Sequence, residues 1–167
     1  MRHTWMLLFA VFACGSDDPG GDSDCLPRTS GFEPEHAHLD GMGTYAGASC
    51  LESGCHLSGA VGADSPAYLA AGTIFKADGV TPQAGATMRL VPLNNGAPAV
   101  AVTDASGNFF ILAGTTNPFP AIPEVTACPN VDRMLEGAFD PSYGNCNVEG
   151  CHSLQPGPGP GPIVLND

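Results

Sequence analysis

Apolar and polar residues alternate through the middle of the chain, roughly residues 69–126, in a pattern typical of β-strands. The clearest example is residues 86–93 (ATMRLVPL), in which Met88 and Leu90 share one face. Further strands are expected at residues 71–76, 100–103, 108–112 and 124–127, with turns such as Asn94-Asn95-Gly96 between them. Short strands without an intervening amphipathic helix predict a mainly β fold, a small antiparallel β-sandwich flanked by loop-rich segments.

The segments on either side of these strands have no strand or helix periodicity, except that residues 131–139 (VDRMLEGAF) predict a short helix. Glycine and proline are frequent, with 22 and 16 residues, which agrees with a loop-rich chain. The predicted organisation is a signal peptide (1–13), an acidic tether (14–35), a first Cys/His segment (36–68), the sandwich (69–128), a second Cys/His segment (129–154) and an extended or disordered Pro/Gly tail (155–167).

The N-terminus carries an apolar run, residues 5–13, that is too short to span a bilayer but suits the core of a signal peptide. It ends in Val11, Ala13 and Cys14, and this junction resembles a bacterial lipoprotein signal. The resemblance implies cleavage before Cys14 and lipid attachment to its sulfur. The alternative is an ordinary signal peptide with an incidental cysteine. We therefore expect an exported protein of the cell envelope, either an outer-membrane lipoprotein or a cell-surface protein. Gly15 rather than Asp after Cys14 favours the outer membrane over the inner membrane.

The chain is strongly acidic, with 17 acidic and 5 basic residues and a net charge of -12. Binding to nucleic acid needs clustered lysine and arginine, and attraction to anionic lipid headgroups needs a basic face. Both are excluded by this composition. Contact with a membrane is expected through the lipid anchor alone.

Two copies of one motif, Cys-x4-Cys-His with glycine before the second cysteine, account for four of the seven cysteines. The motif residues are Cys50, Cys55 and His56 in the first copy and Cys146, Cys151 and His152 in the second. Random placement of so few cysteines and histidines makes even one copy improbable. The two copies therefore require a common cause.

Covalent attachment of haem explains this pattern. Two thiols on one loop add to the two vinyl groups of the porphyrin, and the histidine after the second cysteine then ligates the iron. The four-residue spacing resembles the variant found in some multihaem c-type cytochromes, including cytochromes c3, and departs from the usual two-residue spacing. The resemblance implies two covalently bound haem c groups and electron transfer without catalysis, with redox partner proteins or extracellular electron acceptors as partners.

Four histidines remain after removal of the signal peptide, as many as two haems with two imidazole ligands each require. His36 and His38 are the candidate distal ligands, within one chain or for a neighbouring subunit. The alternative is that both are surface residues of an acidic loop. Met42, Met88 and Met134 are alternative sixth ligands, although Met88 is also expected in the sandwich core.

Cys25 and Cys128 lie outside both motifs and flank the first Cys/His segment and the sandwich. A disulfide between them would close a long loop and stabilise the fold by roughly 2 to 4 kcal/mol. The sequence predicts this pairing but does not prove it.

The middle of the chain resembles the carboxypeptidase regulatory-like domains of exported bacterial proteins. The matching stretches are residues 71–74 (AGTI), 81–87 (TPQAGAT) and 103–109 (TDASGNF). The resemblance implies a β-sandwich scaffold and no catalytic residues. A haem motif on each side of such a domain resembles exported multihaem cytochromes, some of which polymerise, so a homopolymeric filament is a further hypothesis.

Three other interpretations of the clusters remain open. Small disulfide loops, Cys50–Cys55 and Cys146–Cys151, would suit a binding or adhesion module but leave both adjacent histidines without a role. Zinc would take three ligands from each cluster, but it needs reduced thiolates, which an exported setting disfavours. An enzyme is the weakest of the three, because no arrangement of serine and histidine or of paired acids is evident.

Overall fold

The computed structural model describes residues 45–51, 55–57, 66–114, 117–133, 139–140, 144–147, 152–154 and 161–165. Within these ranges all regular structure is β, in seven strands: β1 (Tyr68–Lys76), β2 (Thr87–Pro92), β3 (Ala99–Val102), β4 (Asn108–Leu112), β5 (Ala121–Ala127), β6 (Asn130–Arg133) and β7 (Ile163–Leu165). Among these residues there is no helix with the length and apolarity needed to cross a membrane. The predicted mainly β fold is confirmed.

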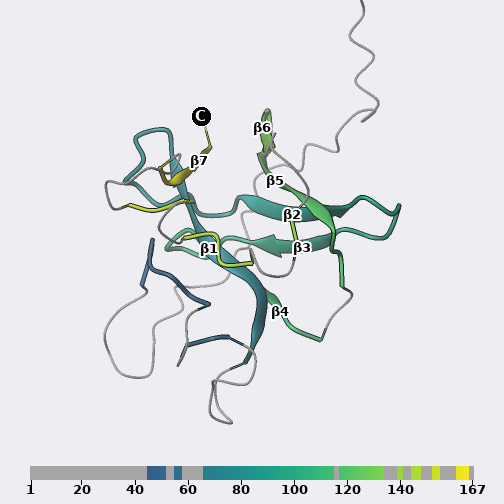
Figure 1. Ribbon diagram of the computed structural model, residues 1–167. Helices are drawn as coiled ribbons and strands as arrows, with labels where there is room; N and C mark the ends of the chain where they lie inside the picture. Colours follow the sequence, from purple (N-terminus) through teal and green to yellow (C-terminus); the bar gives the residue numbers. More distant parts are fainter. Residues whose placement is uncertain are drawn as a thin grey trace, which may run out of the picture.

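The strands form two sheets that share one core. One sheet has the order β4-β1-β7 and the other β3-β2-β5-β6. In Figure 1 the long strand β1 runs across the direction of β2 and β3. The core is built from residues of both sheets and from four residues beyond the strands, Ala86, Phe119, Phe139 and Cys146. Its large side chains include Ile74, Met88, Leu90, Phe109, Ile111 and Leu165. Met88, a predicted core residue, is 1% exposed.

The two central strands of the larger sheet, β2 and β5, are joined by a buried ion pair on the face opposite Met88. Arg89 pairs in register with Glu124 of β5, and its Nη1 lies 3.0 Å from Oε1 of Glu124. The Glu124 side chain is 2% exposed and that of Arg89 is 14% exposed. A carboxylate buried to this extent requires such a partner, because its desolvation is otherwise costly.

Two elements differ from the sequence predictions. The short helix predicted at residues 131–139 is wrong over its first turn, because Asn130–Arg133 forms β6 and pairs antiparallel with β5. The neighbouring strand supplies backbone partners that outweigh a weak helical pattern. In the Pro/Gly tail, Ile163–Leu165 forms β7 and lies parallel to Ile74–Lys76 of β1. The otherwise antiparallel sandwich therefore has one parallel strand pair, which closes an edge of the smaller sheet.

Candidate functional site

The first Cys-x4-Cys-His loop is joined directly to the start of β1. The amide of His56 donates a 3.0 Å hydrogen bond to the carbonyl of Cys50, which closes the loop. The carbonyl of His56 then accepts a 3.0 Å hydrogen bond from the amide of Tyr68, the first residue of β1. The loop therefore has a fixed position relative to the smaller sheet.

The imidazole of His56 is held by two contacts. Its Nδ1 lies 2.8 Å from the carbonyl oxygen of Pro66, and its ring stacks on Tyr68 with 4.1 Å between centroids and 16° between planes. Tyr68 stacks in turn on Phe110 of β4, at 5.0 Å and 19°. A carbonyl can only accept, so Nδ1 carries the proton and Nε2 is the basic nitrogen of the neutral ring. This is the tautomer of a histidine that ligates a metal through Nε2.

The second loop repeats this geometry. The amide of His152 donates a 3.2 Å hydrogen bond to the carbonyl of Cys146. Nδ1 of His152 lies 3.0 Å from the carbonyl oxygen of Gly161. The first thiols also match, since Sγ of Cys50 and of Cys146 contact the carbonyl two residues earlier, at 3.7 Å and 3.8 Å. Two loops in different parts of the chain thus have the same closure and the same histidine orientation.

The second loop begins beside β1, where its first residues pair with Ala71. Ala71 donates to the carbonyl of Gly144 at 3.0 Å and accepts from the amide of Cys146 at 3.1 Å, so Asn145 pairs parallel with Ala71. Further along the same strand, β7 pairs with Ile74–Lys76. Residues 144–147, which include the first cysteine of the second motif, and β7 therefore both pair with β1. The rest of the second motif lies between these two segments in the sequence.

The side chain of Asn147 links the second loop to β1 and to its own histidine. Its Oδ1 accepts a 2.5 Å hydrogen bond from the amide of Thr73, and its Nδ2 donates to the carbonyl of His152 at 3.3 Å. The residue is 4% exposed. A Cβ at Gly72 would lie 2.8 Å from Oδ1 of Asn147 and 2.9 Å from Cβ of Cys146. Glycine at position 72 is therefore what allows this loop to approach the strand.

The two motifs meet at the residues that precede their first cysteines. Nδ2 of Asn145 donates a 2.5 Å hydrogen bond to Oγ of Ser49, across 96 residues of sequence. The amide of Gly47 also donates to Oγ1 of Thr73 in β1, at 2.7 Å. The sandwich therefore brings the two Cys/His clusters side by side along one strand.

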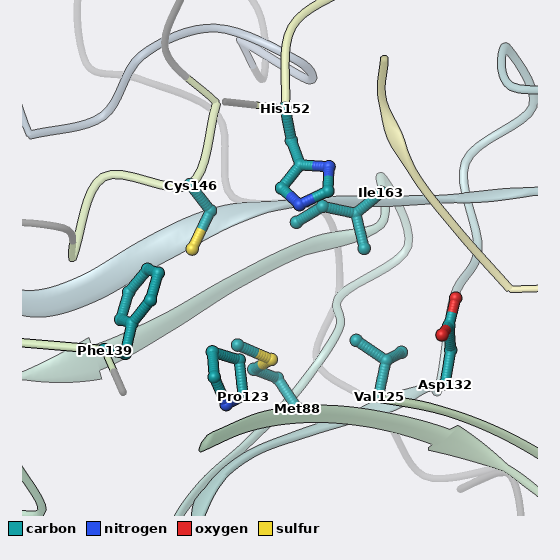
Figure 2. Close-up of a pocket in the computed structure, with 8 residues that line it drawn as sticks. All are labelled: Met88, Pro123, Val125, Asp132, Phe139, Cys146, His152 and Ile163. Atoms are coloured by element: carbon teal, nitrogen blue, oxygen red, sulfur yellow. The ribbon is translucent and has the colours of Figure 1, made fainter. Parts of the chain in front are cut away.

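A pocket of about 130 Å³ lies beside the second motif. It is lined by Met88, Pro123, Val125, Asp132, Phe139, Cys146, His152 and Ile163. Figure 2 shows the thiol of Cys146 and the imidazole of His152 entering from one wall, with Met88, Pro123 and Val125 on the opposite wall. Apart from Asp132, Cys146 and His152, the lining side chains are apolar, which suits the faces of an aromatic macrocycle.

The cysteines are in different chemical states. Cys50 and Cys55 are both thiols, and Cys146 is not in a disulfide either, so neither motif is closed by a disulfide bond. Burial, together with the neighbouring Cys55 thiol, raises the pKa of Cys50 to about 11. Zinc binding needs a thiolate, which this raised pKa disfavours. Cys128, in contrast, is disulfide-bonded.

Several predicted site residues lie outside the described part of the chain: Cys14, Cys25, His36, His38 and Cys151. The other described cysteines are not in disulfides, so the partner of Cys128 also lies outside this part of the chain, as do the predicted lipid attachment site and both predicted distal histidines. Among the described residues, no three His, Cys, Asp or Glu side chains gather into a metal site.

The described residues of both motifs fit haem attachment in their donor set. In each motif the backbone amide of the histidine closes the loop on the first cysteine. In each, Nδ1 of the histidine faces a backbone carbonyl, which leaves Nε2 as the nitrogen that could ligate iron. The pocket at the second motif is smaller than a porphyrin. A porphyrin attached to the second motif would therefore not fit within this pocket and would extend beyond it.

Sequence reasoning missed the residues that place the two motifs. Ser49 and Asn145 each directly precede a first cysteine, and Asn147 directly follows one, so polar residues adjoining the motifs were the available signal. The roles of the Pro66 and Gly161 carbonyls have no side-chain signature at all. Comparison of the chain with family models, with curated proteins and with solved structures found no match.

Proposed function

We propose that this protein is an electron-transfer protein that carries two covalently bound haem c groups, one on each Cys-x4-Cys-His loop. The observation that carries the proposal is the shared geometry of the loops. In both, the histidine amide closes the loop on the first cysteine, and Nδ1 of the same histidine is directed at a backbone carbonyl. Small disulfide loops would need neither feature, and Cys50 and Cys55 are not bonded to each other.

In this proposal each cysteine thiol adds across one vinyl double bond. The sulfur forms a C–S bond with one vinyl carbon and the thiol proton goes to the other, so the addition needs no oxidant. Cys50 and Cys55 would hold one group, and Cys146 and Cys151 the other. His56 and His152 would then ligate iron through Nε2, with Nδ1 fixed by the Pro66 and Gly161 carbonyls. The haem supplies reversible one-electron chemistry, and the chain supplies attachment, ligands and spacing.

The contact between Ser49 and Asn145 supports electron exchange within one chain. The two hydrogen-bonded side chains and one peptide unit on each side connect the Cα atom of Cys50 to that of Cys146. Their combined length means that these two Cα atoms lie at most about 17 Å apart. Two haems attached at such neighbouring points would lie close together. Transfer rather than catalysis follows if His36, His38 or another side chain fills the sixth position of each iron, because substrate then has no open site.

The remaining features agree with an exported carrier. The proposed lipid on Cys14 would anchor the chain to the outer membrane or cell surface, and residues 14–35 would act as a tether. The sandwich would serve as a scaffold of the carboxypeptidase regulatory-like type. Redox partner proteins or extracellular electron acceptors would be its partners, and assembly into a filament is an extension of the same proposal.

Paired cysteine variants test the proposal directly. The full chain is produced in a bacterial host with haem c maturation machinery, and covalent haem is quantified by the pyridine spectrum of the denatured protein. We expect two haems per chain, and one haem after Cys50→Ala with Cys55→Ala or after Cys146→Ala with Cys151→Ala. The matched control, Cys25→Ala with Cys128→Ala, removes two cysteines outside the motifs and should leave two haems. Absence of covalent haem from the unmodified chain would contradict the proposal.

A further inference from the structure

The histidine of the first motif lies at the end of a stack of three rings, His56, Tyr68 and Phe110. The imidazole of His56 lies on the Tyr68 ring with 4.1 Å between centroids and 16° between planes. Tyr68 lies on Phe110 in turn, at 5.0 Å and 19°. Tyr68 begins β1 and Phe110 belongs to β4, and these two strands pair antiparallel. The stack therefore extends from the first motif onto the smaller sheet.

We propose that Tyr68 is a positioning residue for the first haem iron, whose ring fixes the plane of the His56 imidazole. This inference rests on the proposed function, because it assumes that Nε2 of His56 ligates iron. The hydrogen bond between Nδ1 and the Pro66 carbonyl restrains one atom of the imidazole, and a hydrogen bond tolerates a range of angles. A nearly parallel ring on one face of the imidazole restrains its plane as well.

Tyr68 is tied to the first motif by more than its ring. Its amide donates a 3.0 Å hydrogen bond to the carbonyl of His56. Burial, with the Cys50 thiol as a second cause, raises the pKa of Tyr68, so the phenol keeps its proton and its ring meets the imidazole without a charge. Tyr68 thus lies near the candidate iron ligand and near one of the candidate attachment cysteines.

The second motif holds its histidine differently. Nδ1 of His152 also lies close to a carbonyl, that of Gly161, at 3.0 Å. Within the part of the chain that the structure describes, however, no aromatic ring stacks on the His152 imidazole. The orientation of an axial imidazole sets the splitting of the iron d orbitals, and this splitting determines the electron paramagnetic resonance (EPR) signal of a ferric haem. The first haem should therefore give a sharper EPR signal than the second.

The experiment uses the full haem-loaded protein and two substitutions at one position. Tyr68→Phe keeps the ring, whereas Tyr68→Leu removes it and keeps an apolar side chain. Phe119→Leu is the control for loss of a ring elsewhere, because Phe119 packs on Phe139 and not on a histidine. The measurements are the haem content, the EPR spectrum of the ferric protein and a redox titration. The variant with Cys146→Ala and Cys151→Ala, which should carry the first haem alone, identifies the signal of that haem.

We expect two haems per chain in Tyr68→Phe, Tyr68→Leu and Phe119→Leu. Tyr68→Leu should broaden the EPR signal of the first haem and leave that of the second unchanged. It should also raise the reduction potential of the first haem, because the negative face of an aromatic ring favours the more positive ferric state. Tyr68→Phe and Phe119→Leu should retain the original signal and potential.

Three results would overturn this inference and leave the proposed function standing. The first, which needs no Tyr68 variant, is an EPR signal of the first haem as broad as that of the second. The second is an unchanged signal of the first haem in Tyr68→Leu. The third is loss of the first haem from Tyr68→Leu, because Tyr68 would then be required for attachment or folding rather than for the orientation of His56. An unmodified protein without covalent haem would overturn both proposals.

Discussion

Asn145 and Ser49 are 96 positions apart, and the amide Nδ2 of Asn145 donates a 2.5 Å hydrogen bond to the hydroxyl of Ser49. Each residue immediately precedes the first cysteine of its motif. The bond therefore joins the two loops at equivalent positions, and it is where the fold couples them.

Substitution of either residue should weaken this coupling. We expect Ser49→Ala to lower the free energy of unfolding by about 1 kcal/mol, because a partly buried amide loses its acceptor. Asn145→Ala should have a similar effect, and the double variant should cost less than the sum of the two, which denaturant unfolding of all four proteins measures. Strict additivity of the two effects would show that the hydrogen bond contributes nothing to stability.

Gly72 should tolerate no side chain without displacement of the second loop. A Cβ there would lie under 3.0 Å from both Asn147 Oδ1 and Cys146 Cβ. We expect Gly72→Ala to destabilise the fold by about 1 to 3 kcal/mol and to impair haem attachment at the second motif but not at the first. Thermal unfolding and haem content report the two effects. Gly96→Ala, in an exposed turn, is the control and should leave haem content unchanged.

Removal of one partner of the Arg89–Glu124 pair should destabilise the fold more than removal of both. Removal of one partner by Arg89→Met leaves the Glu124 carboxylate buried, and we expect a loss of about 3 kcal/mol in the free energy of unfolding. Replacement of both, by Arg89→Met with Glu124→Leu, should recover much of that loss. Urea titrations measure both values, and a double variant less stable than Arg89→Met would refute this account of the pair.

The raised pKa of Cys50 predicts a pH dependence in the haem-free chain. The folded thiol keeps its proton up to about pH 11, whereas the unfolded thiol releases its proton near pH 9. The unfolded state therefore binds fewer protons between these values, and stability should fall as the pH rises from 9 to 11, while it is unaffected by this group below pH 9.

The Cys50→Ser variant provides the control for this effect, because serine does not titrate in the range. Denaturant midpoints measured from pH 8 to 11 should decline more steeply for the unmodified haem-free chain than for Cys50→Ser. Parallel pH profiles would mean that Cys50 has an ordinary thiol pKa in the folded protein.

Much of the sandwich could be predicted because its strands carry their own side-chain pattern. Residues 108–112 were predicted and observed with the same bounds, since Phe109 and Ile111 alternate with more exposed positions after a turn. β7 could not be predicted in this way. It lies next to a Pro/Gly run and its three residues, Ile163–Leu165, are all apolar, so its sequence shows no alternation.

The candidate site, too, could be predicted from the sequence only in part. The two motifs and their histidines are visible in the sequence because both copies have the same spacing. Their adjacency is not, because it depends on residues 144–147 pairing with the edge of β1 beside Ala71. Met88 illustrates a further limit: its alternation identified it as a core residue, and only the structure shows that this part of the core opens onto His152 and Cys146.

The central claim is that haem is bonded to both motifs, and the intact mass of the purified, denatured chain tests it most directly. Noncovalent ligands dissociate on denaturation, so only thioether-linked groups remain. The account predicts the mass of the processed polypeptide and its lipid plus two haem groups, with fragments that place one on residues 50–55 and one on residues 146–151. A mass that corresponds to polypeptide and lipid alone would contradict it.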